Sequence, residues 1–283
     1  MSTRKPVRKT SSSRAPARKP VAGTPPWVLP AATVAVLALL VGVFLIYRYY
    51  TTPVPPPAPS QDTTSQVISI ITTLPASQFD TIGQGSANNL VKPVTGTTAT
   101  GATGKPLLLY IGAEYCPYCA AQRWPLIIAL SRFGTFSGLK TTTSSSSDVF
   151  PNTVTFTFHG ATYTSQYIDF RAVETLDRDQ NQLDTPSATD QDLINRYDSG
   201  GTIPFLDFGN HYASTGAFYS PETIGGMSWL ALAETLQQPD SPQAKAVIGS
   251  ANVITAALCK MSGDQPASVC SSTAVQSIEK TLK

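Results

Sequence analysis

A long charge-free segment near the N-terminus places the strongest constraint on the fold. Residues 21–47 carry no charged side chain, and from Trp27 onward the segment is almost entirely apolar (WVLPAATVAVLALLVGVFLIY). About 20 helical residues, at 1.5 Å each, span the ~30 Å hydrocarbon core of a bilayer. A secretory signal has a shorter apolar region, about 7–15 residues, followed by a small-residue cleavage site. Here the segment runs into YRYYTTPVPPP instead. We therefore predict a transmembrane signal-anchor helix over residues 27–50.

Charge is distributed unevenly on the two sides of this segment. Eight Lys and Arg residues and no acid precede position 49, which leaves 20 − 8 = 12 basic residues against 18 acids in the remainder. Basic flanks stay on the cytoplasmic side of a membrane. The asymmetry predicts a disordered cytoplasmic tail over residues 1–26 and a single-pass protein of the cell membrane, in contact with the lipid bilayer through residues 27–50. The C-terminal domain is then extracytoplasmic. Because topology accounts for the basic tail, nucleic acid is not an expected partner.

Beyond the apolar segment, the chain divides into a linker and one domain. The Pro-rich residues 51–64 (TTPVPPPAPSQDTT) predict an extended linker, and residues 65–283 form the expected domain. In that domain, residues 105–113 (KPLLLYIGA) form a continuous apolar run, which is typical of a strand buried on both faces. Further patterns predict helices over 65–74, 120–134, 189–197, 220–236 and 241–261, two strands within 153–174, and a hairpin over 201–219 that turns at Gly209–Asn210. This alternation predicts the α/β class.

Two of the four cysteines, Cys116 and Cys119, lie where the apolar strand is followed by a helix. Pro117 suits the first helical position, which places Cys116 at the helix N-terminus. Free backbone N–H groups and the helix dipole stabilise a thiolate there, and Cys119 lies one turn on, on the same face. This asymmetry predicts a redox-active dithiol, in which Cys116 is the nucleophile and Cys119 resolves the mixed disulfide.

Two other interpretations of this pair stay open. A zinc or copper site needs about four ligands, and the other candidates are the remaining two cysteines with His159 and His211. A purely structural disulfide is the second alternative, since disulfides are the default state outside the cytoplasm. A c-type haem would need a histidine directly after Cys119, where Ala120 stands. We expect no metal and no cofactor, and we interpret both histidines as turn residues.

The other two cysteines, Cys259 and Cys270, flank a Gly- and Pro-containing loop (KMSGDQPASV) after a predicted helix. A bond between them closes a loop of roughly a dozen residues, which contributes about 3 kcal/mol in the chain-entropy model. We predict a structural disulfide that holds the last segment of the chain on the body of the domain.

At these residues the sequence resembles the thioredoxin superfamily. LLLYIGAEYCPYCA is similar to the strand, Cys-x-x-Cys turn and helix of that fold, and GTIPFLDF is similar to its second signature, a loop with a cis proline facing the dithiol. The resemblance implies a thioredoxin-like sandwich in which Pro204 is cis. It also implies that the Ile203 backbone binds a substrate chain as an added strand, and Tyr118 is a further candidate for substrate binding.

The wider pattern resembles an uncharacterised family of membrane-anchored thioredoxin-like proteins of actinobacteria and archaea, a domain of unknown function. GKPLLLYIGAEYCPYCAAQRW, TIPFLDFGNHY and ANVITAALCKMSGDQPASVC carry this resemblance, which extends over about residues 65–283. Relative to a minimal thioredoxin, it implies an insertion at about 135–200 and a C-terminal helical extension at about 240–283.

One departure from the thioredoxin pattern concerns proton transfer. Thioredoxins carry a buried Asp in the strand before the dithiol, and the matching position here is Tyr110. The expected proton acceptor for Cys119 is therefore missing unless Glu114 or Tyr118 replaces it, and we regard Glu114 as a candidate proton shuttle. Arg123, on the helix that follows, is expected to be exposed.

Together these features predict a membrane-anchored, extracytoplasmic thiol-disulfide oxidoreductase that acts on exported proteins. The location favours an oxidase or isomerase over a reductase, and either role implies a membrane redox partner. The alternative is a non-catalytic binding or scaffolding module at the cell surface, in which both cysteine pairs are structural disulfides.

Overall fold

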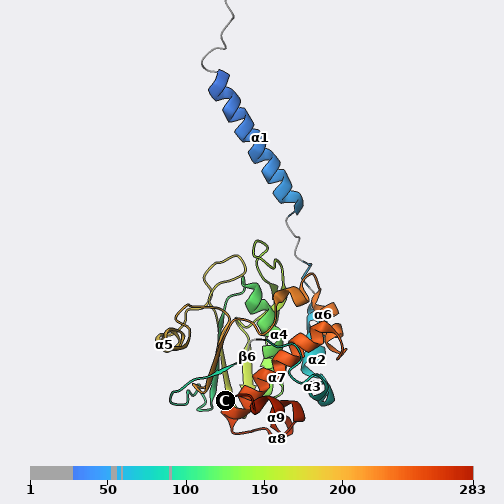
Figure 1. Cartoon of the computed structure of the whole chain (residues 1–283), viewed down its shortest axis with the longest axis vertical. Coiled ribbons are helices and arrows are strands. Elements are labelled where there is room, and N and C mark those ends of the chain that lie inside the picture. The colour runs from blue at the N-terminus through green and yellow to red at the C-terminus, as the bar shows by residue number, and fades with distance from the viewer. Residues whose placement is uncertain (1–27, 52–55, 59, 89–90, 283) are drawn as a thin grey trace, which may run out of the picture. The chain divides into compact units, whose positions relative to one another are not determined.

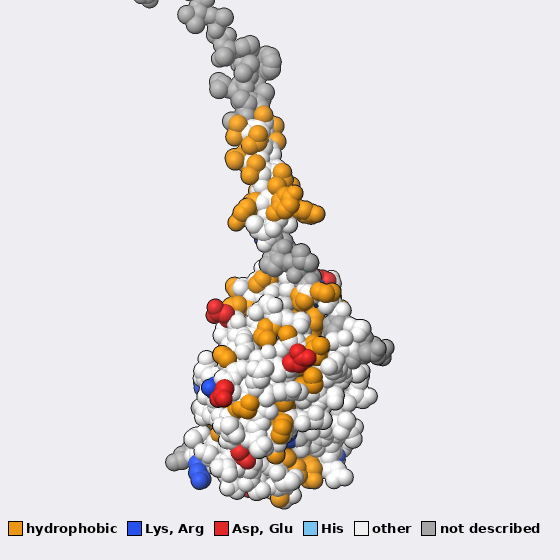
Figure 2. Space-filling view, turned by 90° about the vertical axis from the view of Figure 1, so that its right-hand side faces the viewer, with side chains coloured by type: hydrophobic (Ala, Val, Ile, Leu, Met, Phe, Trp, Pro, Cys, Tyr) orange, Lys and Arg blue, Asp and Glu red, His pale blue; other side chains and the backbone are white. Residues whose placement is uncertain are grey.

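The computed structural model describes residues 28–51, 56–58, 60–88 and 91–282 (Figure 1). The chain divides into two compact units, residues 1–51 and 52–283. The described part of the first unit is a single helix, α1 (Val28–Thr51). Its apolar window Val34–Thr51 is not buried by other parts of the chain, and Figure 2 shows hydrophobic side chains along the face in view. α1 is long and apolar enough to span a membrane. The expected basic tail, residues 1–26, lies outside the described residues.

The second unit is a mixed α/β domain built on a five-stranded sheet. The strand order is β1–β9–β8–β2–β7, in which β2 and β7 are parallel and the other neighbours are antiparallel. The strands are β1 (Lys92–Pro93), β2 (Leu107–Gly112), β7 (Asp169–Glu174), β8 (Phe205–Phe208) and β9 (Tyr212–Thr215). The predicted α/β class is confirmed, and so is the hairpin, which turns through Gly209 and Asn210 at φ values of 63° and 61°.

Helices cover both faces of the sheet, and β2 is an interior strand between β8 and β7. All six residues of β2 are buried, as its continuous apolar sequence predicts. Leu108 and Tyr110 belong to the main core, whereas Leu109 and Ile111 belong to a smaller core on the other face. The main core is covered by two helices that pack on each other and the smaller core by a third, on the opposite side in Figure 1. These three helices are α4 (Pro117–Ser131), α7 (Pro242–Ser262) and α5 (Ala188–Tyr197).

Shorter helices from the two ends of the domain pack on the α7 side. They are α2 (Gln61–Thr72), α3 (Ala76–Ile82), α6 (Trp229–Leu236), α8 (Ala267–Cys270) and α9 (Thr273–Glu279). α2 includes the last four residues of the expected linker, so the linker is shorter than predicted. The expected helix over 220–236 is also wrong, because two glycines separate a 3-10 turn, η1 (Pro221–Ile224), from α6.

Two small antiparallel sheets lie between α4 and β7 in the sequence. β3 (Gly134–Ser137) pairs with β6 (Thr162–Ser165), and β4 (Lys140–Thr143) pairs with β5 (Val154–Thr157). The segment expected to form two strands therefore forms three, β5, β6 and β7, of which the first two pair with earlier strands. The expected insertion, residues 135–200, contains these two small sheets together with β7 and α5, which belong to the main layers of the domain.

Candidate functional site

Cys116 and Cys119 lie at the junction of β2 and α4. Cys116 is the N-cap of α4, with extended backbone angles, and Pro117 is the first helical residue. The Cys116 sulfur accepts a hydrogen bond from the backbone N–H of Cys119 at 3.3 Å. This bond satisfies one of the free N–H groups at the start of the helix, as serine and aspartate do at other N-caps. Both cysteines are free thiols.

The two thiols differ in exposure and in acidity. Cys116 keeps 6% of its surface exposed, whereas Cys119 is fully buried. The hydrogen bond from the Cys119 side chain, assisted by the Cys119 backbone N–H and the charge of Arg123, lowers the pKa of Cys116 despite its burial. Burial raises the pKa of Cys119 well above its usual value, and the interaction with Cys116 adds to this. The pair therefore has the asymmetry expected of a nucleophilic and a resolving thiol.

The Ile203–Pro204 segment faces the outer thiol. Its peptide bond is cis, the conformation that the thioredoxin resemblance implies. The Cys116 thiol donates a long hydrogen bond to the carbonyl oxygen of Ile203, at 4.0 Å between sulfur and oxygen. β8 begins directly after Pro204 and pairs with β2. Two segments about 90 residues apart thus meet at one end of the sheet.

A buried ion pair lies close to the dithiol, contrary to the expectation that Arg123 is exposed. Arg123 is fully buried and makes two hydrogen bonds to Glu174 at the end of β7, at 2.8 and 2.6 Å. It also donates to the carbonyl oxygen of Ala113, in the turn before Cys116, at 2.8 Å. Burial alone would lower the pKa of Arg123, but the Glu174 carboxylate, together with Tyr110 and Cys119, raises that pKa well above its usual value. The positive charge is thus secured beside the thiols, and it lowers the pKa of both.

Tyr110 occupies the position at which thioredoxins have a buried acid. Its hydroxyl is buried and has no hydrogen-bond partner among the described residues, and the Arg123 guanidinium lies 5.9 Å from its ring centre. Burial raises the pKa of Tyr110 well above its usual value, so the phenol stays protonated. Its hydroxyl also occupies the space where a Cβ at Gly112 would lie, 2.1 Å away. Tyr110 therefore does not supply the proton acceptor that an aspartate would.

Glu114 precedes Cys116 in the cysteine turn, and Tyr118 follows it. Glu114 is buried, and its carboxylate lies 3.5 Å from the Thr142 hydroxyl of β4. Its role as a proton shuttle stays a prediction. Tyr118 is 41% exposed and packs edge-on against Phe150. It thus remains available to a substrate.

The segment 144–152 reaches the dithiol from the small β4–β5 sheet. The Ser145 backbone N–H donates to the carbonyl oxygen of Tyr115 at 2.9 Å, which fixes the segment beside the cysteine turn. Val149 at its tip is 72% exposed. Among the described residues outside α1, Val149 and Tyr118 are the exposed large hydrophobic side chains. Tyr118 packs on Phe150, next to Val149 in the sequence, so both exposed apolar side chains belong to the region of the cysteine turn and segment 144–152.

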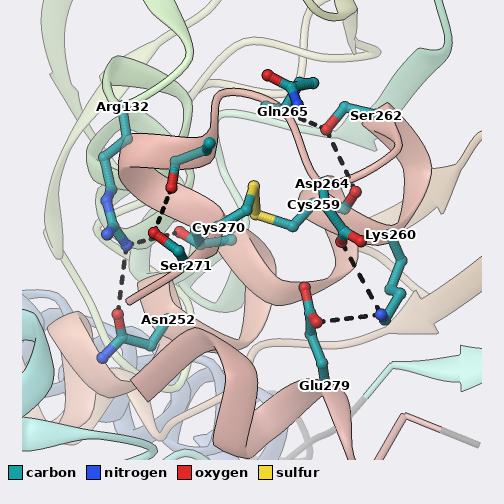
Figure 3. Close-up of a disulfide and its surroundings, with 12 residues drawn as sticks. Arg132, Asn252, Cys259, Lys260, Ser262, Asp264, Gln265, Cys270, Ser271 and Glu279 are labelled. Atoms are coloured by element: carbon teal, nitrogen blue, oxygen red, sulfur yellow. Dashed lines mark hydrogen bonds and ion pairs between the residues drawn. A yellow bond between two sulfur atoms is a disulfide. The ribbon is translucent and has the colours of Figure 1, made fainter. Parts of the chain in front are cut away.

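The other predicted residues make no contact with the two thiols among the described interactions. Cys259 and Cys270 form a disulfide with an S–S distance of 2.01 Å, which joins the end of α7 to α8 beside the Lys260–Glu279 ion pair (Figure 3). His159 lies 2.9 Å from Asp184, and His211 lies 3.0 Å from the Thr98 hydroxyl. No group of three or more His, Cys, Asp and Glu in the described part of the chain could hold a metal ion.

Three functional features escape the sequence prediction: the buried Arg123, its partner Glu174, and the apolar tip of segment 144–152. A signal for the first was present, because Arg123 follows Cys119 by four residues and so shares its helix face. Glu174 is the last residue of β7, and its partner is 51 residues away. No local pattern indicates where segment 144–152 folds back.

Comparison with known proteins gives a family for part of the domain. Residues 96–195 are similar to a family described as a domain of unknown function (DUF929). This match is shorter than the expected 65–283, and it includes β2, both cysteines of the dithiol, Arg123 and Glu174 but not Ile203–Pro204. No curated protein and no solved structure matches the chain.

Proposed function

We propose that the chain is a membrane-anchored thiol-disulfide oxidoreductase with a thioredoxin-like fold, whose Cys116–Cys119 dithiol exchanges disulfides with exported proteins. One observation carries this proposal. The Cys116 sulfur caps the N-terminus of α4 and lies 4.0 Å from the carbonyl oxygen of Ile203. The low-pKa sulfur lies beside the residues that lead into β8. An extended peptide that carries a disulfide can approach the sulfur there.

The exchange has two steps. The Cys116 thiolate attacks one sulfur of a substrate disulfide, a Cys116–substrate bond forms, and the other substrate sulfur leaves as a thiolate that takes a proton from water. The Cys119 thiol then loses its proton and attacks the Cys116 sulfur. This forms the Cys116–Cys119 disulfide and releases the second substrate thiol, so two electrons pass to the substrate. The reverse sequence oxidises a substrate dithiol.

Whether the protein acts as an isomerase or as an oxidase depends on the reactant that restores the Cys116–Cys119 pair after each exchange. Isomerisation of a substrate returns the dithiol unchanged and needs no other reactant. Net oxidation needs a two-electron acceptor that restores the Cys116–Cys119 disulfide, and we assign this to a membrane redox protein. An extracytoplasmic location, with α1 in the bilayer and the basic N-terminus in the cytoplasm, favours oxidation or isomerisation.

The apolar surface around Cys116 supports a polypeptide substrate. Tyr118 is exposed two residues after Cys116, and its ring packs on Phe150, the neighbour of the exposed Val149. Tyr118 and Val149 are the exposed large hydrophobic side chains of the described domain outside α1. Exposed apolar groups that cluster at a reactive residue mark a site for protein binding. Incompletely folded exported proteins present such apolar segments together with reactive cysteines.

A redox titration of the full-length chain in detergent tests the proposal. The protein is equilibrated in glutathione buffers, and mass spectrometry follows each cysteine pair separately. We expect Cys116–Cys119 to titrate reversibly between about −120 and −270 mV, while Cys259–Cys270 stays oxidised. A Cys116–Cys119 pair that stays oxidised below about −300 mV would instead be structural, and the chain would be a non-catalytic binding module.

A further inference from the structure

A cavity of about 290 Å³ lies beside Ile203, on the face of the sheet that α5 covers. Ile203 lines this cavity, and its carbonyl oxygen faces the Cys116 sulfur. Ile203 is therefore the residue that connects the cavity to the Cys116 sulfur. Its volume is below the roughly 300–1,000 Å³ of sites for drug-sized ligands, so it suits a single amino-acid side chain.

The walls of the cavity are mainly apolar. Ile111 and Phe205, at facing ends of β2 and β8, form one wall, and Ile194 of α5 forms another. These residues belong to the smaller core cluster or pack against it, so their positions are set by the fold. Such walls suit the aliphatic stem of a long side chain.

One charged group contributes to the lining. Asp198 is the C-cap of α5, and its Oδ2 atom is buried without a hydrogen-bond partner among the described residues. No described ion pair includes this carboxylate. A negative group at a helix C-terminus is unfavourable, because the helix dipole already places negative charge there. Oδ2 has almost no accessible surface, so a ligand in the cavity meets the accessible part of the Asp198 carboxylate. A carboxylate without an ion-pair partner favours a cationic donor.

We propose that this cavity binds a Lys or Arg side chain of the substrate polypeptide, next to the cysteine that reacts with Cys116. The stem of the side chain lies against Ile111, Ile194 and Phe205, and its cationic end pairs with Asp198. This inference rests on the proposed function and adds a substrate class to it: cysteines with a basic neighbour. An acidic residue next to the substrate cysteine would be repelled by Asp198. A neutral apolar residue would leave the Asp198 carboxylate without a partner.

Peptide disulfides with a chromophoric leaving thiol test this preference. Each peptide carries one cysteine as a mixed disulfide with 2-nitro-5-thiobenzoate, and Lys, Arg, Met or Glu stands directly before or after it. The reduced full-length chain in detergent releases the chromophore, which gives a second-order rate constant. We expect Lys and Arg peptides to react about tenfold faster than the Met peptide at one of the two positions, and the Glu peptide to react slowest. The mixed disulfide of mercaptoethanol, which has no neighbouring residue, measures exchange by itself.

Variants separate the cavity from general electrostatics. Asp198→Asn should remove the preference for Lys over Met, and Asp198→Lys should make the Glu peptide faster than the Lys peptide. Asp192→Asn removes an exposed charge from the same helix and should leave the preference intact. Ile194→Trp narrows the cavity without changing charge and should also abolish the preference, which gives a second test if the Asp198 variants do not fold.

The outcomes distinguish the inference from the function on which it rests. Equal rates for the Lys, Met and Glu peptides, together with rapid exchange, would overturn the cavity assignment and leave the oxidoreductase function in place. A preference that Asp198→Asn does not change would also overturn it. No exchange with any peptide or with the mercaptoethanol disulfide would instead reject the proposed function.

Discussion

Arg123 of α4 and Glu174 of β7 form a fully buried, bidentate ion pair close to the cysteine turn. The guanidinium also holds the Ala113 carbonyl, and the carboxylate accepts a weak hydrogen bond from the Phe158 N–H at 3.4 Å. Four segments of the chain thus meet at one pair of charges. Burying two charges has a large desolvation cost, so such a pair adds little net stability compared with apolar residues. It does, however, place a fixed positive charge near the thiols.

Removing one member of this pair should destabilise the domain. Glu174→Leu leaves the Arg123 charge buried and uncompensated, and we expect the free energy of unfolding to fall by about 3–5 kcal/mol. Chemical denaturation of the full-length chain in detergent, followed by tryptophan fluorescence, measures this change.

The double variant Arg123→Met with Glu174→Leu is the matched control. It removes both charges and should recover most of the lost stability, because an apolar pair of similar volume needs no compensation. The loss of unfolding free energy in the double variant is compared with the added losses of Glu174→Leu and Arg123→Met alone. Equal values would show that the two residues do not act as a pair.

The acidity of Cys116 should depend most on its neighbour in the turn. The hydrogen bond from Cys119 is the largest cause of the lowered Cys116 pKa, and Arg123 is a smaller one. We expect Cys119→Ala to raise the pKa of Cys116 more than the double variant Arg123→Met with Glu174→Leu does. The rate of alkylation by iodoacetamide as a function of pH measures the thiolate fraction of Cys116. Equal titration curves for all three proteins would contradict this assignment.

Asp207 of β8 should make stability depend on pH. Burial raises its pKa to about 6, although the Asn210 N–H and Arg196 act in the opposite direction. The folded chain therefore binds this proton more tightly than the unfolded chain, and the free energy of unfolding should fall as the pH rises from about 4 through about 6. Asp207→Asn removes this pH-dependent fall in the free energy of unfolding. At pH 8 the variant should therefore be more stable than the parent chain, by up to about 3 kcal/mol, and at pH 4 the two proteins should be similar.

Thermal unfolding of both proteins between pH 4 and pH 8 checks the sign. Asp192→Asn, on the exposed side of α5, is a control for loss of a carboxylate, and its stability relative to the parent chain should not change with pH. A parent chain whose stability rises between pH 4 and pH 6 to the same extent as that of Asp207→Asn would contradict the prediction.

Local patterns in the sequence account for much of the fold. The apolar run of β2 predicts a strand covered on both faces, and the Gly209–Asn210 turn predicts the β8–β9 hairpin, because each pattern reflects its own residues. Strand partners are different. β5 and β6 are close in sequence, yet each pairs with a strand before it, because pairing depends on distant segments and on how the chain fills the space over α4.

The candidate site divides in the same way. The spacing of Cys116 and Cys119 and the loop at Pro204 are local signals, and both are found at one end of the sheet. The prediction for Arg123 is wrong, since a charged residue on a helix is normally exposed. Its burial becomes understandable only with Glu174, and no single-sequence pattern links the two residues.

The Cys259–Cys270 disulfide should stabilise the domain without taking part in exchange. It closes a loop with a sequence separation of 11 between the end of α7 and α8 (Figure 3). Replacing both cysteines with serine should lower the free energy of unfolding by about 2–4 kcal/mol. The rate of exchange with the mercaptoethanol disulfide at 25 °C should stay the same. A fall in that rate, with the variant still folded, would connect the two cysteine pairs.

Val149 should contribute to the binding of polypeptides but not to the chemistry at Cys116. Val149→Ser removes an exposed apolar side chain from segment 144–152, and we expect kcat/KM for an apolar peptide disulfide to fall roughly fivefold, in line with the transfer free energy of such a side chain. The rate with the mercaptoethanol disulfide should not change, because that substrate is too small to reach segment 144–152. Val149→Leu is the matched control and should keep or improve the peptide rate. If Val149→Ser slowed both substrates equally, Val149 would act through the structure of the cysteine turn, which Ser145 holds through the Tyr115 carbonyl, and the apolar surface would lose its role in substrate binding.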